Sequence, residues 1–585
     1  MSNTIYFNAF NVRINSVKWH EFVIKRRSGK IDKQIRTEIG RLWRDGLVLA
    51  ESTGSGYSWL LLRKMDIDVL SSHAYIEVPF GSVPPSVILN FYVITRSESA
   101  GSRAVFVAPT KKYWEARRSK KEDLRYCLYP QFSMWQETLI VNVSATCIRT
   151  ANAKHKKAFQ VFESNDSMVH KSVGYRVPKD GEIIKDPPAK GAKVRIPWSP
   201  TNSDAGPLAS KMNFLSWLMS DINISGIASL VPIRFDCIPL KLLIGARGQD
   251  AKVTKKKMIQ AITSVRPTNT VDIYDRRTEA GNHVSWDLII AAMRRTAIRF
   301  GIEIKDLGSS PHQPGLSPVF VAIDSEDVFE TEDIDTKAAA VAGFFGPVQC
   351  FSSGILKESE NEVDEVVESV FLVMMTNFYI KLEVAESRLL MHREWACQTI
   401  TGSVSDYMFC ERFEIGENAL YVGLHISTSG ELTFTGFNSL PNLFSIFINR
   451  QTIPVFKLNQ GDPSLEQWPG TIVIQDTPVK ALPLLSREDM TPHFSGVRII
   501  KALNCYYAGG AERPSSGKVE KALVLRQVTR IGGNNENDLE IMAGFCVDPT
   551  VRVHAATVWP APFKLIREYV TMKHGASTTP EINQV

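Results

Sequence analysis

The sequence predicts a multidomain α/β protein, and three observations lead to this fold class. The chain has 585 residues, whereas one domain takes roughly 150, so several domains are expected. Its first part is rich in short alternating strands, while its second part alternates helices with buried strands, the pattern of an open α/β sheet. Hydrophobic residues make up 44% and charged residues 22% of the chain, which excludes a largely disordered protein.

Hydrophobic periodicity predicts the elements of the first part of the chain. The expected elements are strands at 5–14 and 17–24, a helix at 31–43, a hairpin over 47–62, a strand-rich stretch at 74–107 and a basic helix at 111–125. A helix that leads into a hairpin is also the signature of a winged-helix DNA-binding module, and at this point both interpretations are open. Residues 150–207 are rich in proline and predict a short irregular connector with one hairpin.

The second part predicts two successive α/β units. In the first we expect a helix at 212–222, a buried strand at 240–244, and helices at 255–265 and 286–300. The second unit begins at Pro318 with a strand at 319–323 that ends on Asp324. A strand at 349–355 then leads into a helix at 361–378 with one apolar face.

Charge and cysteine usage limit the function classes. The net charge of +6 is small for this length, so a nucleic-acid surface has to come from local basic clusters such as 111–121, 154–157, 255–257 and 294–295. The eight cysteines show no pair at the spacing of a zinc or redox site, which predicts a reducing compartment and no structural metal. Without a signal peptide or a run of roughly 18 apolar residues, we expect an intracellular protein, cytoplasmic or nuclear, with no membrane partner.

The C-terminal run resembles the end of a PIWI domain. It contains the strand Ala522–Leu525, the turn Thr529-Arg530-Ile531, the acidic helix start Asn537–Ile541 and Pro560-Ala561-Pro562-Phe563 at the start of a last helix. Upstream, three further segments resemble strands of the PIWI nuclease fold, namely Pro318–Asp324, Ala338–Gly343 and Leu389–Glu394. Near the N-terminus, Asn8–Val12, Trp19–Lys25 and Ser133–Thr146 resemble the Argonaute N domain and first linker. This order identifies the chain as a member of the Argonaute/PIWI superfamily and disfavours the winged-helix interpretation.

The resemblance implies a domain layout. The expected parts are an N domain at 1–110, a first linker with a short connector at 111–207, a Rossmann-like MID domain at 208–316, an RNase H-like PIWI domain at 317–575 and a polar tail at 576–585. The chain between Thr146 and Leu208 is too short for a full PAZ domain, which in the family holds the guide's 3′ end.

In this family a Tyr, Lys, Gln and Lys set in the MID domain holds the guide's 5′ phosphate, because a terminal phosphate needs converging donors and positive charge. The resemblance places Lys257 and Arg295 on the two lysines and Asn269 on the glutamine. The tyrosine position falls on Val253, which removes the stacking platform. The expected 5′-phosphate-binding residues are Lys257, Asn269, Arg295, Arg299 and Arg530.

PIWI nucleases use three carboxylates and a fourth ligand, Asp or His, to hold two divalent ions roughly 3.5–4 Å apart. Asp324 matches the first ligand, and Glu362 matches the mobile glutamate, although Glu362 equally suits a helix N-terminus. Glu394 stands at the second aspartate and Lys521 at the fourth ligand, where an ammonium about 5 Å from a divalent ion opposes it by about 6–7 kcal/mol at an effective dielectric constant near 20. The resemblance therefore implies an inactive nuclease. Mg²⁺ at the guide 5′ phosphate is the one cofactor left open.

Two functions from different classes remain open. The first is a guide-binding protein that pairs a short RNA or DNA guide with a complementary target, does not cut it, and recruits effector proteins for silencing or defence. The second is a scaffold subunit of a silencing complex that binds protein partners and no guide. A third possibility, an active endonuclease, would need another carboxylate such as Asp476 in the site.

Overall fold

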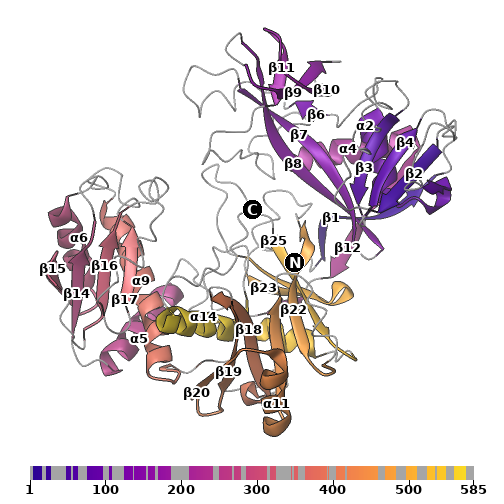
Figure 1. The fold of residues 1–585 in the computed structure, drawn as a ribbon. Coiled ribbons are helices and arrows are strands. Elements are labelled where there is room, and N and C mark those ends of the chain that lie inside the picture. The colour runs from indigo at the N-terminus through magenta and orange to yellow at the C-terminus, as the bar shows by residue number, and fades with distance from the viewer. Residues whose placement is uncertain are drawn as a thin grey trace. The chain divides into compact units, whose positions relative to one another are not determined.

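The computed structural model divides the chain into two compact units, each of which is described by itself (Figure 1). The first unit holds Met1–Asp236 with two short later segments, and the second holds most of the remaining chain. None of the described helices is long and apolar enough to cross a membrane. The structure describes residues 4–15, 22–27, 48–54, 57–62, 76–95, 105–107, 124–135, 137–152, 156–164, 169–185, 210–236, 238–240, 249–265, 269–277, 285–311, 317–324, 344, 348–352, 363–391, 393, 403–415, 418–458, 468–481, 496–509, 523–533, 537–548 and 559–574.

An eight-stranded sheet forms the larger part of the first unit, with strand order β11-β9-β10-β6-β7-β8-β1-β12. Its strands are β1 (Thr4–Ile14), β6 (Val105–Val107), β7 (Leu124–Trp135), β8 (Thr138–Thr150), β9 (Phe159–Ser164), β10 (Val169–Arg176), β11 (Ile183–Lys185) and β12 (Ala228–Asp236). β9 and β10 pair antiparallel, which confirms the hairpin predicted in the connector. The helix α4 (Lys211–Ser225) precedes β12 and confirms the helix expected at 212–222.

A second sheet of this unit has the order β3-β4-β2-β5. Its strands are β2 (Phe22–Arg27), β3 (Val48–Gly54), β4 (Tyr57–Leu62) and β5 (Ile76–Val78). β3 and β4 form the expected hairpin. The stretch expected to be strand-rich instead contains the helix α2 (Pro85–Thr95), because a short apolar run fits a buried helix as well as a strand. Pro85 occupies the first helical position, where its missing N–H costs nothing. The expected helix at 31–43 and most of that at 111–125 lie outside the described residues.

The second unit contains a parallel sheet of four strands in the order β15-β14-β16-β17. The strands are β14 (Thr270–Asp275), β15 (Glu303–Gly308), β16 (Val319–Ile323) and β17 (Val348–Ser352). One face of this sheet packs against three helices, α5 (Gln249–Val265), α6 (Trp286–Ile298) and α9 (Val363–Ala385). These helices confirm the three expected at 255–265, 286–300 and 361–378.

The position of β16 corrects the layout expected from the sequence. Val319–Ile323, expected to open the nuclease sheet of a separate domain, pairs parallel with β14 on one side and β17 on the other. The boundary expected between residues 316 and 317 therefore falls inside one sheet. The physical reason is that a fully buried parallel strand is an apolar run with no local mark of which sheet it joins. The other expected strand at 338–343 and the tail at 576–585 lie outside the described residues.

A nine-stranded sheet forms the rest of the second unit, in the order β13-β23-β24-β25-β22-β21-β18-β19-β20. Its strands are β13 (Ile238–Leu240), β18 (Tyr407–Ile415), β19 (Asn418–Ile426), β20 (Leu432–Phe437), β21 (Ile453–Leu458), β22 (Ile472–Ala481), β23 (Gly496–Ile500), β24 (Cys505–Gly509) and β25 (Leu523–Arg530). β18, β19 and β20 form an antiparallel meander, after which β21 pairs parallel to β18 and β22 pairs parallel to β21. The order β20-β19-β18-β21-β22 is that of an RNase H fold, and its first strand is β18.

Helices cover the two faces of this sheet. The helix α11 (Leu440–Arg450) packs on the face that carries Met408 and Cys410. The helices α13 (Asp538–Gly544) and α14 (Ala561–His574), both expected from the C-terminal motif, share one core with Phe409 on the other face. The same core continues through α9 to the four-stranded sheet, so one large apolar core joins the two sheets of the second unit.

Candidate nucleic-acid interface

The carboxyl edge of the four-stranded sheet is a natural place for a ligand. From β14 the chain passes through α6 to β15 on one side, and β16 follows on the other side, so the strand order reverses at β14. Open α/β sheets bind ligands outside the carboxyl ends of strands at such a switch point. Here the residues that follow β14 and β16 are Arg276, Arg277 and Asp324.

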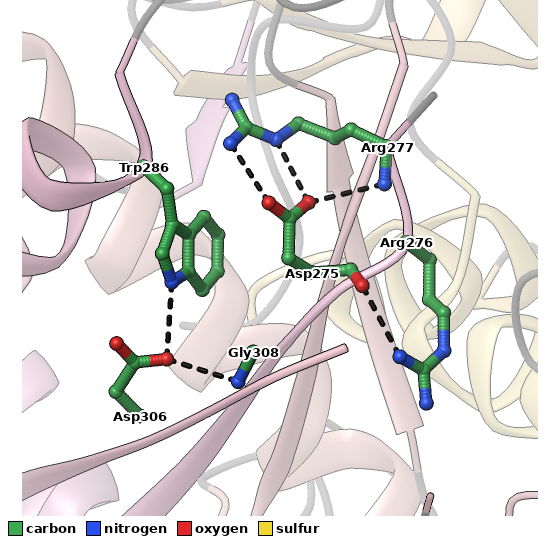
Figure 2. A network of polar contacts seen from close by, with 6 residues as sticks. All are labelled: Asp275, Arg276, Arg277, Trp286, Asp306 and Gly308. Atoms are coloured by element: carbon green, nitrogen blue, oxygen red, sulfur yellow. Dashed lines mark hydrogen bonds and ion pairs between the residues drawn. The ribbon is translucent and has the colours of Figure 1, made fainter. Parts of the chain in front are cut away.

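Figure 2 shows a polar network at this edge. Arg277 donates from Nε and Nη2 to the Asp275 carboxylate at 2.8 and 2.9 Å, and its guanidinium lies 5.2 Å from the centre of the Trp286 ring. Trp286 Nε1 donates to Asp306 Oδ1 at 3.0 Å, which joins the start of α6 to the end of β15. Arg276 donates to Ser310 O at 2.7 Å. The expectations from sequence did not include these arginines, although an Asp-Arg-Arg run directly after a buried strand is a usable signal.

Most of the expected phosphate-binding residues lie at the opposite edge. The Asn269 carbonyl accepts from Glu303 N at 2.7 Å, so Asn269 stands at the amino ends of β14 and β15. Arg295 and Arg299 lie at the end of α6, which reaches the same edge, and both side chains are exposed. Lys257 is exposed on α5, roughly two turns before that helix ends. Val253 lies on α5 as well.

Arg530 is engaged inside the second unit. At the end of β25 it donates from Nε and Nη2 to the two carboxylate oxygens of Asp538 at 2.7 and 2.6 Å. Its Nη1 donates to Gly470 O at 3.2 Å. This bidentate pair ties the start of α13 to the sheet, so the arginine has a structural partner where the sequence suggested a phosphate ligand.

Asp324 is the one of the four expected nuclease residues that lies within the described part of the chain. Asp324 follows β16 in the four-stranded sheet, so it is not on the first strand of the RNase H-type order. Glu362, Glu394 and Lys521 lie outside the described residues. Leu389–Met391, expected to form an apolar strand, belong to no strand, and the nearby Arg393 is a buried structural residue. Its guanidinium contacts Glu383 at 2.5 Å and also pairs with Asp548, and these two carboxylates raise its pKa.

A row of charged side chains occupies the nine-stranded sheet instead, and we call it the charged row. Its members are Glu411 on β18, Lys457 on β21, Asp476 on β22, Arg526 on β25 and Arg567 on α14. Side chains alternate between the faces of a strand, so Glu411 shares the face of Phe409, beneath α14. Lys457 Nζ contacts Glu411 Oε1 at 2.5 Å, and Arg567 Nε donates to the same oxygen at 3.1 Å. Arg526 pairs with Asp476.

Trp559, just before α14, contacts two cations of the row. The Arg526 guanidinium lies 3.4 Å and the Lys457 ammonium 4.8 Å from the centre of its ring, which are cation–π contacts. Burial lowers the pKa of Lys457 to about 8, and the neighbouring Arg567 and Arg526 add to this, while Glu411 opposes it. Burial is also the main cause that lowers the pKa of Arg526 to about 9. Lys457 and Arg526 are thus desolvated, and the row is rich in positive charge.

This donor set does not suit a pair of divalent ions. Such a pair needs several carboxylate oxygens free to coordinate. Here each of the two carboxylates is in contact with a cation, and three cations face two carboxylates. Among the described residues there is no group of three or more His, Cys, Asp or Glu placed to hold a metal ion.

The sequence contained two signals for this row. The alternation in Tyr407–Ile415 places Glu411 on the buried face, and the motif Pro560-Ala561-Pro562-Phe563 opens the helix that carries Arg567. Asp476, considered only for an active endonuclease, is a member of the row. The missing step was the pairing of β18 with β21, which no local pattern contains.

Comparison with known proteins shows which solved structures have a similar architecture. Neither protein-family models nor curated proteins give a match to the sequence. Among solved structures, the chain is similar to the Kluyveromyces polysporus Argonaute with a guide RNA, with a TM-score of 0.50 at 8% identity over 98% of this chain and 94% of that one. Aa-Ago with externally bound siRNA gives a TM-score of 0.50 at 9% identity over 97% of each chain. Drosophila Piwi gives 0.43 at 10% identity over 98% of this chain and 97% of that one. The two Argonaute structures thus show that the chain has the multidomain Argonaute fold, as its sequence predicts.

Proposed function

We propose that this protein binds a short guide nucleic acid and pairs it with a complementary target without cutting the target. The charged row carries the proposal. Its Glu411 and Lys457 lie on the strands β18 and β21, at the centre of the RNase H-type order, and cations contact the carboxylates of the row. Guide binding is supported by the fold shared with the K. polysporus Argonaute, whose structure was solved with a guide RNA.

The absence of cutting follows from electrostatics. A divalent ion about 5 Å from the Lys457 ammonium would be opposed by about 6–7 kcal/mol at an effective dielectric constant near 20. Arg567 and Arg526 would add to this opposition. Silencing or defence would then depend on effector proteins that the guide-loaded protein recruits, and no resident catalytic metal is proposed. Mg²⁺ at the guide 5′ phosphate is the one ion compatible with the proposal.

The test starts with protein purified from its own cells. We expect short nucleic acids to co-purify with it, and their sequencing would give the guide chemistry. A complementary labelled target should then be retained by the loaded protein and remain intact with Mg²⁺ or Mn²⁺, and Asp324→Ala should change neither result.

Two results would overturn the proposal. A single cut opposite the middle of the guide would show an active nuclease. The lack of any bound or loadable guide would favour the scaffold function, in which the protein binds only protein partners.

A further inference from the structure

Arg567 is the most exposed cation of the charged row. Its side chain is 41% exposed, compared with 2% for Lys457 and 1% for Arg526, while the carboxylates Glu411 and Asp476 are 6% and 36% exposed. Nε donates to Glu411 Oε1, and Glu411 is the one acceptor that this guanidinium has among the described residues. The planar fork is therefore held through Nε, on a side chain that keeps 41% of its surface exposed.

The charge of Arg567 is not neutralised by Glu411, because Lys457 pairs with the same carboxylate. Lys457 contacts the same Glu411 oxygen at the shorter distance of 2.5 Å and is itself buried, so the single charge of Glu411 is already balanced. Arg526 lies against Trp559 and in contact with Asp476, so a carboxylate is beside this buried cation as well. Two carboxylates thus balance two buried cations, and the third cation, at the surface, remains in excess.

We infer that Arg567 binds a phosphodiester group of the target strand at the place where a nuclease of this fold would hold metal ions. A guanidinium presents parallel donors that match two phosphate oxygens. The contact would hold the strand in register across the row, while Lys457 prevents Glu411 from recruiting an ion. This inference rests on the proposed function, because it needs a guide-loaded protein that binds a target.

The test uses targets with one altered phosphate. In a series of complementary strands, each phosphodiester in turn is replaced by an uncharged methylphosphonate, and target binding to guide-loaded protein is measured. In the wild type, methylphosphonate replacement at one position should lower target affinity about tenfold, as expected for a lost charged hydrogen bond. In Arg567→Gln the same replacement should leave target affinity unchanged, whereas in Arg567→Lys it should still lower target affinity by most of that factor.

Salt dependence gives a second readout. Removing one phosphate contact should reduce the slope of log affinity against log salt by about 1 for Arg567→Gln. The matched control is Arg412→Gln on the opposite face of β18, where Arg412 is 48% exposed and pairs with Glu414 at 3.0 Å. This control should leave both the slope and the methylphosphonate profile unchanged.

The outcomes separate the two proposals. If the wild type binds targets and Arg567→Gln keeps the same methylphosphonate profile and slope, the phosphate contact is refuted while guide binding stands. If the wild type binds no guide or target, the proposed function itself fails, and this inference fails with it.

Discussion

Two regions of the second unit carry the cations expected of a nucleic-acid-binding protein, and they differ in how far these cations are buried. In the charged row, Lys457 and Arg526 are buried and each contacts a carboxylate. On α5 and α6, Lys257, Arg295 and Arg299 are exposed. Buried charges are expensive to leave unpaired, whereas exposed charges cost little to change and can reach a ligand. The buried members of the row should therefore respond to mutation through stability, and the helix surface through binding.

The largest expected effect is on the charged row. Glu411→Leu leaves the buried Lys457 ammonium without its acceptor and should lower the free energy of unfolding by about 3–5 kcal/mol, measured by urea unfolding. The double variant Glu411→Leu/Lys457→Met replaces the pair with apolar groups and should recover to within about 1 kcal/mol of the wild type. Glu414→Leu, on the same strand but 68% exposed, should change stability by less than roughly 0.5 kcal/mol. Equal stability of all three variants would contradict the contrast between the two regions.

A pH series sharpens the same comparison. The pKa of Lys457 is about 8 in the folded protein against 10.5 ordinarily, so between these values the unfolded chain holds more protons. The free energy of unfolding should therefore rise with pH from about 8 to 10.5, by about 3 kcal/mol from this group. Below pH 8, Lys457 should contribute no pH dependence to the free energy of unfolding. Urea unfolding of the wild type and of Lys457→Met across this range isolates the effect, and parallel curves for the two proteins would refute it.

The helix surface should respond in binding. Charge reversal at Lys257 and Arg295 should weaken the binding of a short 5′-phosphorylated oligonucleotide more than that of its 5′-hydroxyl counterpart. The difference should be about 2 kcal/mol if both residues make charged hydrogen bonds to the phosphate. The matched control reverses Lys256 and Arg294, which are the exposed neighbours on the same helices. Fluorescence anisotropy measures both affinities. An equal loss of affinity for the two oligonucleotides would show that Lys257 and Arg295 contact the nucleic-acid backbone in general and not the 5′ phosphate.

The smallest effect is expected where α6 begins. Trp286→Phe keeps a ring beside Arg277 but loses the hydrogen bond to the exposed Asp306, and should cost less than about 1 kcal/mol in a thermal melt. A loss as large as that of Glu411→Leu would mean that this edge is as tightly coupled to the fold as the charged row.

The sequence by itself determined the fold class and most of the elements. Helices α5, α6 and α9 were predicted from hydrophobic periodicity, a property of a few consecutive turns, and α14 was predicted from the motif Pro560-Ala561-Pro562-Phe563. The hairpins β3–β4 and β9–β10 were predicted from turn residues between short strands. The order of motifs along the chain predicted the Argonaute-like fold, which the structural comparison confirms.

Only the tertiary structure decided which strands share a sheet, and this moved the candidate nuclease centre. Val319–Ile323 is an apolar run that suits any buried parallel strand, so its pairing with β14 rather than β21 had no local signal. Glu411, Lys457 and Arg567 come from three segments far apart in the chain and meet through strand pairing and the packing of α14. A charged residue in a sequence window gives no indication of its partner, because burial and the opposing charge are both supplied by distant segments.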